Sequence, residues 1–388
     1  MSLISEDISK QAITTYLRND YLSTKDLTLL RKNLLINDSY FHEDYHTVSY
    51  SKNLFIPVTR LCRDFCTYCA FRISEEKLPN KHEPYITEDQ VKQLLISAKE
   101  LRCTEVLFTL GQSPEEKYEI ALKWLEKEGF LSTIDYIKHL CELALEIGIL
   151  PHSNPGVMTE REFSILKPYN ASMGLMLETT NELLYTSPGG PHYYAPSKSP
   201  EERLKTIELA GILKHPFTTG LLLGIGETKQ DITEALLTIK NLHEKYSHIQ
   251  EIILQPFTPH ENTLWSNFDP YDHDELINTI LLASILVPDI PLQVPPNLRF
   301  NQTLFLQSGC RDFGGVSPIT IDYVNPKNAW PKIEFLRKVV EKEKLIFRER
   351  LPIYPKYIKA KDNAWLSNKI RKTIDIHNLA DNQGFRKS

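Results

Sequence analysis

Short apolar runs alternate with helical patterns along most of the chain. Runs that predict buried strands lie at 54–58, 105–109, 149–151, 171–177, 219–223, 251–255 and 291–294. Between them apolar residues recur at three- and four-residue spacing, as Val91, Leu94 and Ala98 do, which predicts helices. The helices are expected at 87–101, 132–147, 200–214, 230–246 and 272–286. Strands that alternate with helices of this length indicate βα units and a parallel sheet.

The number of these units bears on the architecture. About seven units over roughly 270 residues are too many for a small doubly wound domain and suit a (β/α) barrel. An open sheet with helices on both faces is the alternative. We therefore predict an α/β fold: a full or partial TIM-type barrel at 51–330, preceded by a helical leader at 1–50 and followed by a helical extension at 331–388.

The predicted C-terminal extension is basic and amphipathic. It carries 15 basic and 7 acidic side chains. Its apolar stripe consists of Ile333, Leu336, Val340 and Phe347. Such a stripe predicts a helix that packs on the barrel wall. The excess of basic residues is more typical of a solvated helix face than of a phosphate-binding surface.

Composition and charge exclude several classes of protein. With 41% hydrophobic and 24% charged residues, the chain can form a sizeable core. No run approaches the roughly 18 apolar residues of a spanning helix, and the start, MSLISEDISK, lacks the features of a secretory signal. A net charge of -5 argues against a general nucleic-acid binder. We expect a cytoplasmic protein with neither nucleic acid nor membrane as a partner.

Three of the six cysteines, Cys62, Cys66 and Cys69, are clustered just after the first predicted strand. Chance would produce this spacing in about 1 of 1,000 chains with so few cysteines. Three thiolates on a short loop can hold a soft metal. The remaining cysteines, Cys103, Cys141 and Cys310, stand alone and are expected to be buried small apolar residues.

Three kinds of site fit the clustered cysteines. A structural zinc site would use His82 or another side chain as its fourth ligand, but zinc sites usually pair two C-x2-C knuckles and the chain has no second one. An unligated reactive-thiol site is another possibility. A [4Fe–4S] cluster with three protein-ligated irons and one open iron needs three cysteines. We favour the cluster, because the loop follows a barrel strand, at the end where barrel active sites lie.

The loop sequence CRDFCTYC at 62–69, with an aromatic residue before its third cysteine, resembles the radical S-adenosylmethionine (SAM) superfamily. The resemblance implies a [4Fe–4S] cluster on Cys62, Cys66 and Cys69, whose open iron is chelated by the amino and carboxylate groups of SAM. Electron transfer would cleave SAM to methionine and a 5′-deoxyadenosyl radical that abstracts hydrogen. Tyr68 is expected near the adenine.

Two glycine-containing turns extend the resemblance. Gly111 and Gln112 follow the second strand, where the superfamily has a turn whose backbone meets the SAM ammonium; Gln112 replaces the usual acidic residue. The stretch GLLLGIGE at 220–227 is similar to the superfamily's G-x-I-x-G-x-x-E, with Leu222 in the Ile position. Gly224 would permit the backbone to approach the adenine. The resemblance thus implies that both turns bind SAM.

Longer stretches are similar to one family within the superfamily, the CofG half of FO synthase. They are LPHSNPG at 150–156, NASMGLMLE at 170–178, QVPPNL at 293–298 and DFGGVSP at 312–318. The similarity runs from about Leu54 to Pro355, with Arg311 and Phe313 as small departures. It implies synthesis of the deazaflavin 7,8-didemethyl-8-hydroxy-5-deazariboflavin (FO), the precursor of coenzyme F420.

The family resemblance also implies a reaction and partners. A CofH-type subunit would join a tyrosine-derived hydroxybenzyl group to 5-amino-6-(D-ribitylamino)uracil. The product, 5-amino-5-(4-hydroxybenzyl)-6-(D-ribitylimino)-5,6-dihydrouracil, would be the small-molecule substrate that this chain cyclises to FO with loss of ammonia. A ferredoxin or flavodoxin is the expected reductant. A related enzyme of the CofH or menaquinone type, or a non-catalytic Fe–S or zinc module, is the alternative.

Polar residues near the predicted strand ends are candidates for individual roles. His152 and Asp312 are candidates for the general acid or base that loss of ammonia requires. Ser172, Glu178 and Gln255 are expected to bind SAM, Glu178 through its ribose hydroxyls or ammonium. A rim carboxylate paired with Lys or Arg is the alternative for Glu178.

Three asparagines are candidates for substrate contacts. They are Asn154, Asn170 and Asn297. Strand alternation would place Asn170 on the same face as Ser172, Gly174 and Met176. Asn297 follows two prolines, whose rigidity would position its amide.

Overall fold

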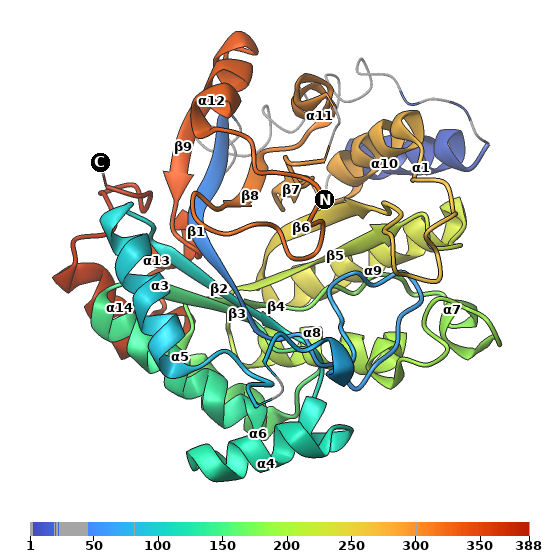
Figure 1. Cartoon of the computed structure of the whole chain (residues 1–388). Coiled ribbons are helices and arrows are strands. Elements are labelled where there is room, and N and C mark those ends of the chain that lie inside the picture. Colours follow the sequence, from blue (N-terminus) through green and yellow to red (C-terminus); the bar gives the residue numbers. More distant parts are fainter. Residues whose placement is uncertain are drawn as a thin grey trace.

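The computed structural model describes residues 3–18, 20, 22, 46–80, 82–298 and 301–387. Within this part of the chain, nine parallel strands form one sheet, and β1 to β8 close into a barrel surrounded by helices (Figure 1). The successive strands β2 to β8 pair in chain order, and β1 completes the ring by pairing with both β2 and β8. The predicted (β/α) barrel is confirmed in its complete form.

The seven predicted strands are present, and an eighth closes the barrel. The strands are β1 (Thr47–Thr59), β2 (Glu105–Leu110), β3 (Leu150–Asn154), β4 (Ser172–Gly174), β5 (Phe217–Leu223), β6 (Ile249–Pro256), β7 (Leu292–Gln293) and β8 (Asp312–Val316). A search for apolar runs misses β8 because two of its five residues are Gly314 and Gly315.

All five predicted helices lie within two residues of their expected bounds. The helices around the barrel are α3 (Glu88–Glu100), α4 (Glu119–Glu128), α5 (Thr133–Ile147), α6 (Glu160–Leu166), α7 (Leu183–Thr186), α8 (Pro200–Ile212), α9 (Lys229–Tyr246), α10 (His273–Leu286) and α11 (Gln302–Ser308). Short 3-10 turns are η1 (Glu75–Lys77), η2 (Pro114–Glu116), η3 (Lys167–Tyr169) and η4 (Pro196–Lys198). Side-chain caps fix several starts: Thr87 and Gln90, for example, form a capping box before α3.

The C-terminal segment contains a strand that the sequence does not reveal. Its elements are α12 (Ile333–Lys342), β9 (Ile346–Arg350), α13 (Pro355–Ile358), η5 (Asn363–Trp365) and α14 (Asn368–Ile376). Strand β9 lies beside the first half of β1 (Figure 1), with Thr47 opposite Ile346 and Ser51 opposite Arg350. The prediction that Phe347 continues the helix is therefore wrong, because that part of β1 offers unpaired backbone groups that β9 satisfies.

The N-terminal leader is helical over Leu3–Leu17, and its other described residues are not helical. Helix α1 (Leu3–Leu17) packs beside α10, and the hydroxyls of Tyr16 and Thr279 lie 2.9 Å apart. Residues 19, 21 and 23–45 of the predicted leader lie outside the described residues. Because β1 begins at Thr47, the helical prediction is wrong for 47–50.

The barrel strands present two different faces. Outward-facing residues such as Leu54, Val106 and Met173 are buried in an apolar core against the helices. Inward-facing residues are largely polar, among them Asn53 and Glu105. The barrel interior is therefore the part of the fold that is built for polar chemistry.

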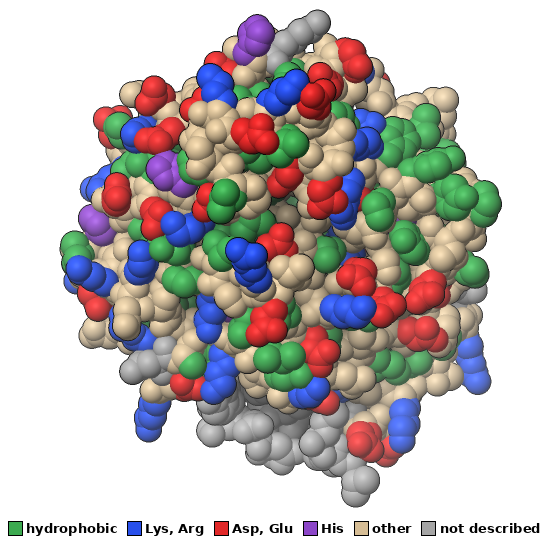
Figure 2. Space-filling model, turned by 90° about the horizontal axis from the view of Figure 1, so that it is seen from below, with side chains coloured by type: hydrophobic (Ala, Val, Ile, Leu, Met, Phe, Trp, Pro, Cys, Tyr) green, Lys and Arg blue, Asp and Glu red, His purple; other side chains and the backbone are tan. Residues whose placement is uncertain are grey.

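The described surface bears on two expected absences. No described helix combines the length and apolar character needed to cross a membrane. On the face shown in Figure 2, basic, acidic and hydrophobic side chains are interspersed over most of the surface.

Candidate active site at the mouth of the barrel

The clustered cysteines lie on the loop that follows β1, at the carboxyl end of the barrel. Cys62, Cys66 and Cys69 are partly exposed free thiols. The other three cysteines, Cys103, Cys141 and Cys310, are buried, as predicted. Active sites of (β/α) barrels are built from the loops at this end. The predicted metal ligands therefore stand where solvent and a ligand can reach them.

Backbone hydrogen bonds clamp the cysteine loop on two sides. On one side, the Arg63 N–H donates to the Gln112 carbonyl at 2.8 Å, beyond the end of β2. On the other, the Phe65 N–H donates to the Tyr194 carbonyl at 2.9 Å. The loop thus has a fixed shape without relying on its cysteine side chains, which remain available as ligands.

The three thiols lie near one another on the loop. Cys62, Cys66 and Cys69 are close enough to interact electrostatically, and burial raises the pKa of Cys62 to about 11. Yet among the described residues no three Cys, His, Asp or Glu side chains converge as the ligands of one metal ion do. A zinc site requires such convergence. A [4Fe–4S] cluster uses one thiolate on each of three irons, so its ligands are spread more widely.

The turn after β2 packs directly against the cysteine loop. A Cβ atom on Gly111 would lie 2.0 Å from the Leu61 carbonyl oxygen, so only glycine permits this approach. The Gln112 N–H donates to Cys62 Sγ at 3.2 Å. The side-chain amide of Gln112 is engaged by the backbone of Val157, accepting from its N–H at 2.8 Å. The contacts of Gly111 and Gln112 with SAM stay predictions.

Glu178 is the centre of a charged cluster that touches the cysteine loop. Its carboxylate accepts a hydrogen bond from the Tyr68 hydroxyl at 2.6 Å and lies 3.0 Å from His192 Nε2. It also pairs with Lys198 and lies 3.6 Å from Arg203. Burial would raise the pKa of Glu178, but Lys198 and Arg203 hold it well below its usual value. The carboxylate is therefore ionised and paired with Lys and Arg, as the alternative interpretation of Glu178 expected. The structure also brings together Tyr68 and Glu178, which were predicted separately to contact SAM, and those contacts with SAM stay predictions.

The backbone of Glu178 is unusual. Its φ of 67° lies in the left-handed region that favours glycine. Outliers of this kind persist only where the surroundings over-determine them, and they cluster at functional sites. Sequence reasoning missed His192, Lys198 and Arg203, because nothing local links them to Glu178; a basic residue some 20 positions downstream is too common to be a signal.

The glycine stretch that follows β5 forms a turn held by its own acidic residue. Gly224 has φ +91°, and its N–H donates to Glu227 Oε1 at 2.5 Å. The Ile225 N–H donates to the other carboxylate oxygen at 2.8 Å. Leu222 pairs in register with Gln255, so these two predicted cofactor contacts lie side by side on β5 and β6. Their contact with SAM stays a prediction.

The upper part of the barrel interior, toward the carboxyl ends of the strands, is open to solvent. Several inward-facing residues keep part of their surface exposed: Leu107, Thr109, Asn154, Met176, Leu222, Ile253 and Gln255. They lie on strands β2, β3, β5 and β6 and, in the case of Met176, just after β4. A small molecule entering beside the cysteine loop would meet these side chains.

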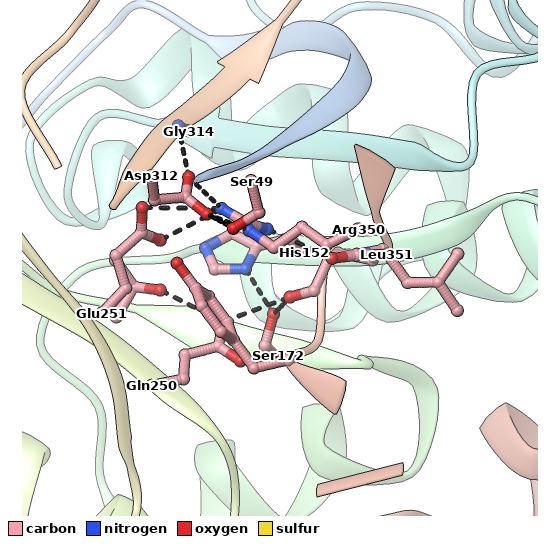
Figure 3. A network of polar contacts seen from close by, with 12 residues as sticks. Ser49, His152, Ser172, Gln250, Glu251, Asp312, Gly314, Arg350 and Leu351 are labelled. Atoms are coloured by element: carbon pink, nitrogen blue, oxygen red, sulfur yellow. Dashed lines mark hydrogen bonds and ion pairs between the residues drawn. The ribbon is translucent and has the colours of Figure 1, made fainter. Parts of the chain in front are cut away.

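The interior at the amino end of the barrel strands, which we call the floor, is closed by a buried polar network (Figure 3). Arg350 of β9 donates from Nε to Asp312 at 2.7 Å and from Nη2 to the same carboxylate at 3.0 Å. Asp312 also accepts from Ser49, and Glu251 lies 3.4 Å from Arg350. Asp312 opens β8, at the end of the barrel opposite the cysteine loop. The structure shows Asp312 as the buried partner of Arg350. A catalytic role for Asp312 stays a prediction.

His152 belongs to the same network. Its Nδ1 lies 2.6 Å from Ser172 Oγ, and its Nε2 lies 3.0 Å from the side-chain amide of Asn154. Burial lowers the pKa of His152 to about 4. The imidazole is therefore neutral near pH 7, which disfavours it as the general acid. Ser172, predicted to bind SAM, instead donates to the Pro352 carbonyl.

Two more carboxyl groups were missed by sequence reasoning. Burial raises the pKa of Glu105 and that of Glu251, despite the nearby guanidinium of Arg350. Glu105 lies at the start of β2 and Glu251 near the start of β6, both otherwise apolar strands. An acidic residue within an apolar strand was the sequence signal that could have identified them. Arg350 offered no signal, because β9 itself was not predicted.

Asn170 does not share the face of Ser172. Its side chain accepts from Ser153 Oγ at 2.7 Å and donates to the Leu166 carbonyl at 3.1 Å, on the helix side of the barrel. The alternation fails because the regular strand begins only at Ser172. Only 1% of the surface of Asn170 is exposed, and its side chain lies away from the barrel interior. The predicted contact with substrate stays a prediction that this placement does not support.

Asn297 joins two loops at the carboxyl end of the barrel. Its amide nitrogen donates to Asp322 at 2.8 Å and to the Asn328 carbonyl at 3.2 Å. Its Oδ1 is buried and has no hydrogen-bond partner among the described residues. The predicted contact with substrate stays a prediction.

Comparison with known proteins connects this geometry to a family. The Radical SAM superfamily model matches residues 56–239. The 7,8-didemethyl-8-hydroxy-5-deazariboflavin synthase of Methanopyrus kandleri is 46% identical over 340 residues, which span 87% of this chain and 99% of that protein. The FO synthase of Nocardia farcinica is 42% identical over 84% of this chain but only 38% of its own length.

A solved structure shares the fold. The FeFe-hydrogenase maturase HydG from Carboxydothermus hydrogenoformans superposes with a TM-score of 0.62 at 16% identity, covering 89% of this chain and 80% of its own. An identity this low supports only a common barrel architecture. The identity with the Methanopyrus kandleri protein, over nearly its full length, is far higher. The chain therefore belongs to the family of 7,8-didemethyl-8-hydroxy-5-deazariboflavin synthases, enzymes with a radical SAM domain.

Proposed function

We propose that this chain cyclises 5-amino-5-(4-hydroxybenzyl)-6-(D-ribitylimino)-5,6-dihydrouracil to the deazaflavin FO with loss of ammonia. The observation that carries the proposal is the cysteine loop at the mouth of a complete barrel, in a chain 46% identical to a synthase over 99% of that protein. SAM would be converted to methionine and 5′-deoxyadenosine as the substrate is oxidised.

Cys62, Cys66 and Cys69 would hold three irons of a [4Fe–4S] cluster and leave the fourth iron for SAM. The chemistry supplied there is one-electron reductive cleavage of SAM, which yields a radical able to abstract hydrogen. The protein's own task is to fix the shape of the loop that carries these thiols. The backbone clamps at Arg63 and Phe65 support that task.

The charged cluster around Glu178 suits the methionyl part of SAM. That part carries one ammonium and one carboxylate. Glu178 supplies negative charge, and Lys198 and Arg203 supply positive charge, next to the Tyr68 hydroxyl. Ligand groups of both signs could therefore be bound without leaving a buried charge unpaired. Leu222 and Gln255 remain our candidates for contacts with the adenine.

The upper barrel interior is the proposed substrate site. Its walls combine apolar side chains such as Leu107 and Ile253 with the polar Asn154. A carbon radical takes hydrogen from most neighbours, so the reaction needs an enclosed site from which water is excluded. The closed floor of the barrel supports this role, because it leaves the carboxyl end as the entrance.

We further propose that a CofH-type protein supplies the adduct and that a ferredoxin or flavodoxin supplies electrons, in the cytoplasm. The match to 38% of the Nocardia farcinica FO synthase supports a second component. The part of that longer protein outside the match would correspond to the component that supplies the adduct.

Anaerobic reconstitution tests the proposal. The chain is purified without oxygen, supplied with iron and sulfide, reduced, and mixed with SAM and the adduct. We expect 5′-deoxyadenosine and a fluorescent deazaflavin in equal amounts. Formation of deoxyadenosine without deazaflavin would indicate that the chain acts on a different substrate. If protein that holds four irons per chain forms neither product, the enzyme assignment is refuted.

A further inference from the structure

A chain of hydrogen bonds leads from the C-terminal segment to the barrel interior. It runs from the Pro352 carbonyl through Ser172 and His152 to the side-chain amide of Asn154 (Figure 3 shows its first members). Ser172, His152 and Asn154 face inward from β4 and β3. Asn154 is the only one of the three that is partly exposed to the interior. The chain therefore connects the buried floor to a side chain that a ligand can reach.

The direction of the first link is fixed by chemistry. Ser172 Oγ lies 2.5 Å from the Pro352 carbonyl oxygen, and two oxygens approach so closely only with a hydrogen between them. A carbonyl has no hydrogen, so the serine hydroxyl donates to it. Ser172 Oγ can then only accept from its other neighbour, His152 Nδ1, at 2.6 Å. His152 must therefore carry a hydrogen on Nδ1.

The second link follows from the charge of His152. A neutral imidazole has one N–H, so with Nδ1 protonated its Nε2 is an acceptor. A second proton would make a buried cation beside the guanidinium of Arg350, which disfavours the charged form. Nε2 thus needs a donor from Asn154, and only the amide –NH2 can donate. The oxygen and nitrogen of an amide have nearly the same shape, so the hydrogen-bond network decides which one faces Nε2.

The structure draws Oδ1 toward His152, 3.0 Å from Nε2. The assignment above turns the amide by 180°, so that –NH2 occupies this position and the carbonyl oxygen occupies the other. Within the described residues no other hydrogen bond to the Asn154 amide is formed, so nothing opposes the rotation. Gly174 leaves room for the amide, since a Cβ there would lie 2.5 Å from it.

We propose that the Asn154 carbonyl oxygen faces the barrel interior and accepts a hydrogen bond from a ring N–H of the substrate's pyrimidinedione, in an orientation set by Ser172 and His152. The inference rests on the proposed function for the identity of the substrate. A ring N–H of this kind can only donate, whereas the hydroxyls of the ribityl chain can donate or accept. A fixed acceptor requires a donor, and the ring N–H is the group that always supplies one. Asn154 is a binding residue, and Ser172 and His152 are positioning residues.

The tautomer of His152 tests the orientation without any turnover. In protein with 15N-labelled histidine, long-range 15N–1H correlation spectra distinguish Nδ1–H from Nε2–H imidazole. His152→Gln identifies the signal by its disappearance. We expect the Nδ1–H form in wild-type protein and a mixture of tautomers in Ser172→Ala. An Nε2–H or doubly protonated His152 in the wild type would overturn the proposal.

Steady-state kinetics test recognition. We expect Asn154→Ala to raise KM for the adduct roughly 10-fold with kcat changed far less, because a hydrogen bond present throughout binding is lost. Ser172→Ala should raise KM by about 3-fold or more. Ser153→Ala is the matched control, a buried serine on the neighbouring strand whose hydroxyl bonds Asn170 instead. Equal KM values for Ser172→Ala and Ser153→Ala would refute the positioning role.

A methylated substrate separates this inference from the proposed function. An adduct with its pyrimidinedione ring N–H replaced by N–CH3 cannot donate to Asn154. We expect wild-type protein to discriminate against it at least 10-fold more strongly than Asn154→Ala does. Equal discrimination by both proteins would refute the acceptor role even if the enzyme makes deazaflavin. If wild-type protein makes none, the proposed function fails, while the spectra still decide the orientation of the His152 chain.

Discussion

The carboxyl end of the barrel keeps its three clustered thiols partly exposed, whereas the amino end buries its charged groups against one another. At the carboxyl end Cys62, Cys66 and Cys69 are partly exposed, on a loop that backbone hydrogen bonds at Arg63 and Phe65 help to hold. At the amino end Arg350 and Asp312 are buried and form two hydrogen bonds. Both ends carry charge, so the difference lies in whether a partner is already present. A site for ligands is where the fold leaves polar groups to be completed.

The two ends also differ in how their charges are balanced. Glu178, near the cysteine loop, is held ionised by Lys198 and Arg203, an arrangement with more positive than negative charge. On the floor, Arg350 serves three acidic groups, and burial raises the pKa of Glu105 and Glu251. The excess positive charge at the mouth would suit an anionic group. On the floor, the raised pKa values favour protonated Glu105 and Glu251, and Arg350 already has Asp312 as its partner.

The largest expected effect concerns the cysteines. Cys66→Ala should remove the cluster and reduce deazaflavin formation more than about 1,000-fold, since no other described residue replaces a missing ligand. The matched control is Cys141→Ala, a fully buried thiol on α5. It should retain iron and activity while losing some stability. Iron content and product fluorescence measure both variants; normal iron in Cys66→Ala would contradict the assigned ligands.

Removal of Arg350 should destabilise the floor. Arg350→Met leaves Asp312 buried without its partner, which we expect to lower the free energy of unfolding by about 3–5 kcal/mol. Arg348→Met is the control two residues earlier on β9, because its partner Asp381 is 27% exposed and such pairs contribute about 1 kcal/mol or less. Urea unfolding compares the two. Similar losses in both variants would show that the floor is no more dependent on its charges than the surface.

Loss of one hydroxyl at the mouth should weaken SAM binding. Tyr68→Phe removes the hydrogen bond to Glu178 and is expected to raise Kd for SAM roughly 10-fold, measured by calorimetry on reconstituted protein. Tyr136→Phe also removes a buried hydroxyl, one that donates to the Ile86 carbonyl, and should leave Kd unchanged. An unchanged Kd in Tyr68→Phe would separate this hydroxyl from the cofactor site.

The smallest expected effect is a dependence of stability on pH. His152 has a pKa of about 4 when folded, below its ordinary value of about 6.5, so the unfolded chain binds more protons between these values. Its contribution to stability is complete above pH 6.5 and is lost as pH falls toward 4. Between pH 7.5 and 5.5 wild-type protein should lose about 1 kcal/mol more than His152→Gln.

That comparison isolates one histidine. Glu105 and Glu251 have raised pKa values and oppose the trend, because the folded chain then binds their protons more tightly as pH falls. Both variants contain these carboxyl groups, so their contribution cancels to first order. Parallel urea midpoints for the two proteins across this pH range would contradict a neutral, buried His152.

Local sequence patterns determined much of the fold. Helices such as α9 and α10 were predicted within a residue or two, because apolar spacing and capping residues are local properties. The cysteine loop was recognisable for the same reason, since its three ligands lie within one short segment. Gly111 and Gly224 were also placed in turns, where close backbone approach and a positive φ leave no other residue type free of strain.

Only the tertiary structure decided what completes each end of the barrel. Strand β9 pairs with β1 across some three hundred residues, and no local pattern encodes a partner so distant. That pairing brings Arg350 to Asp312 and Pro352 to Ser172, so two residues that the sequence offered as catalytic or cofactor candidates have partners in the buried network that no local pattern predicts. Alternation assigns a residue to a face, but the depth along the barrel and the identity of the neighbour depend on strand register, which is set by long-range packing.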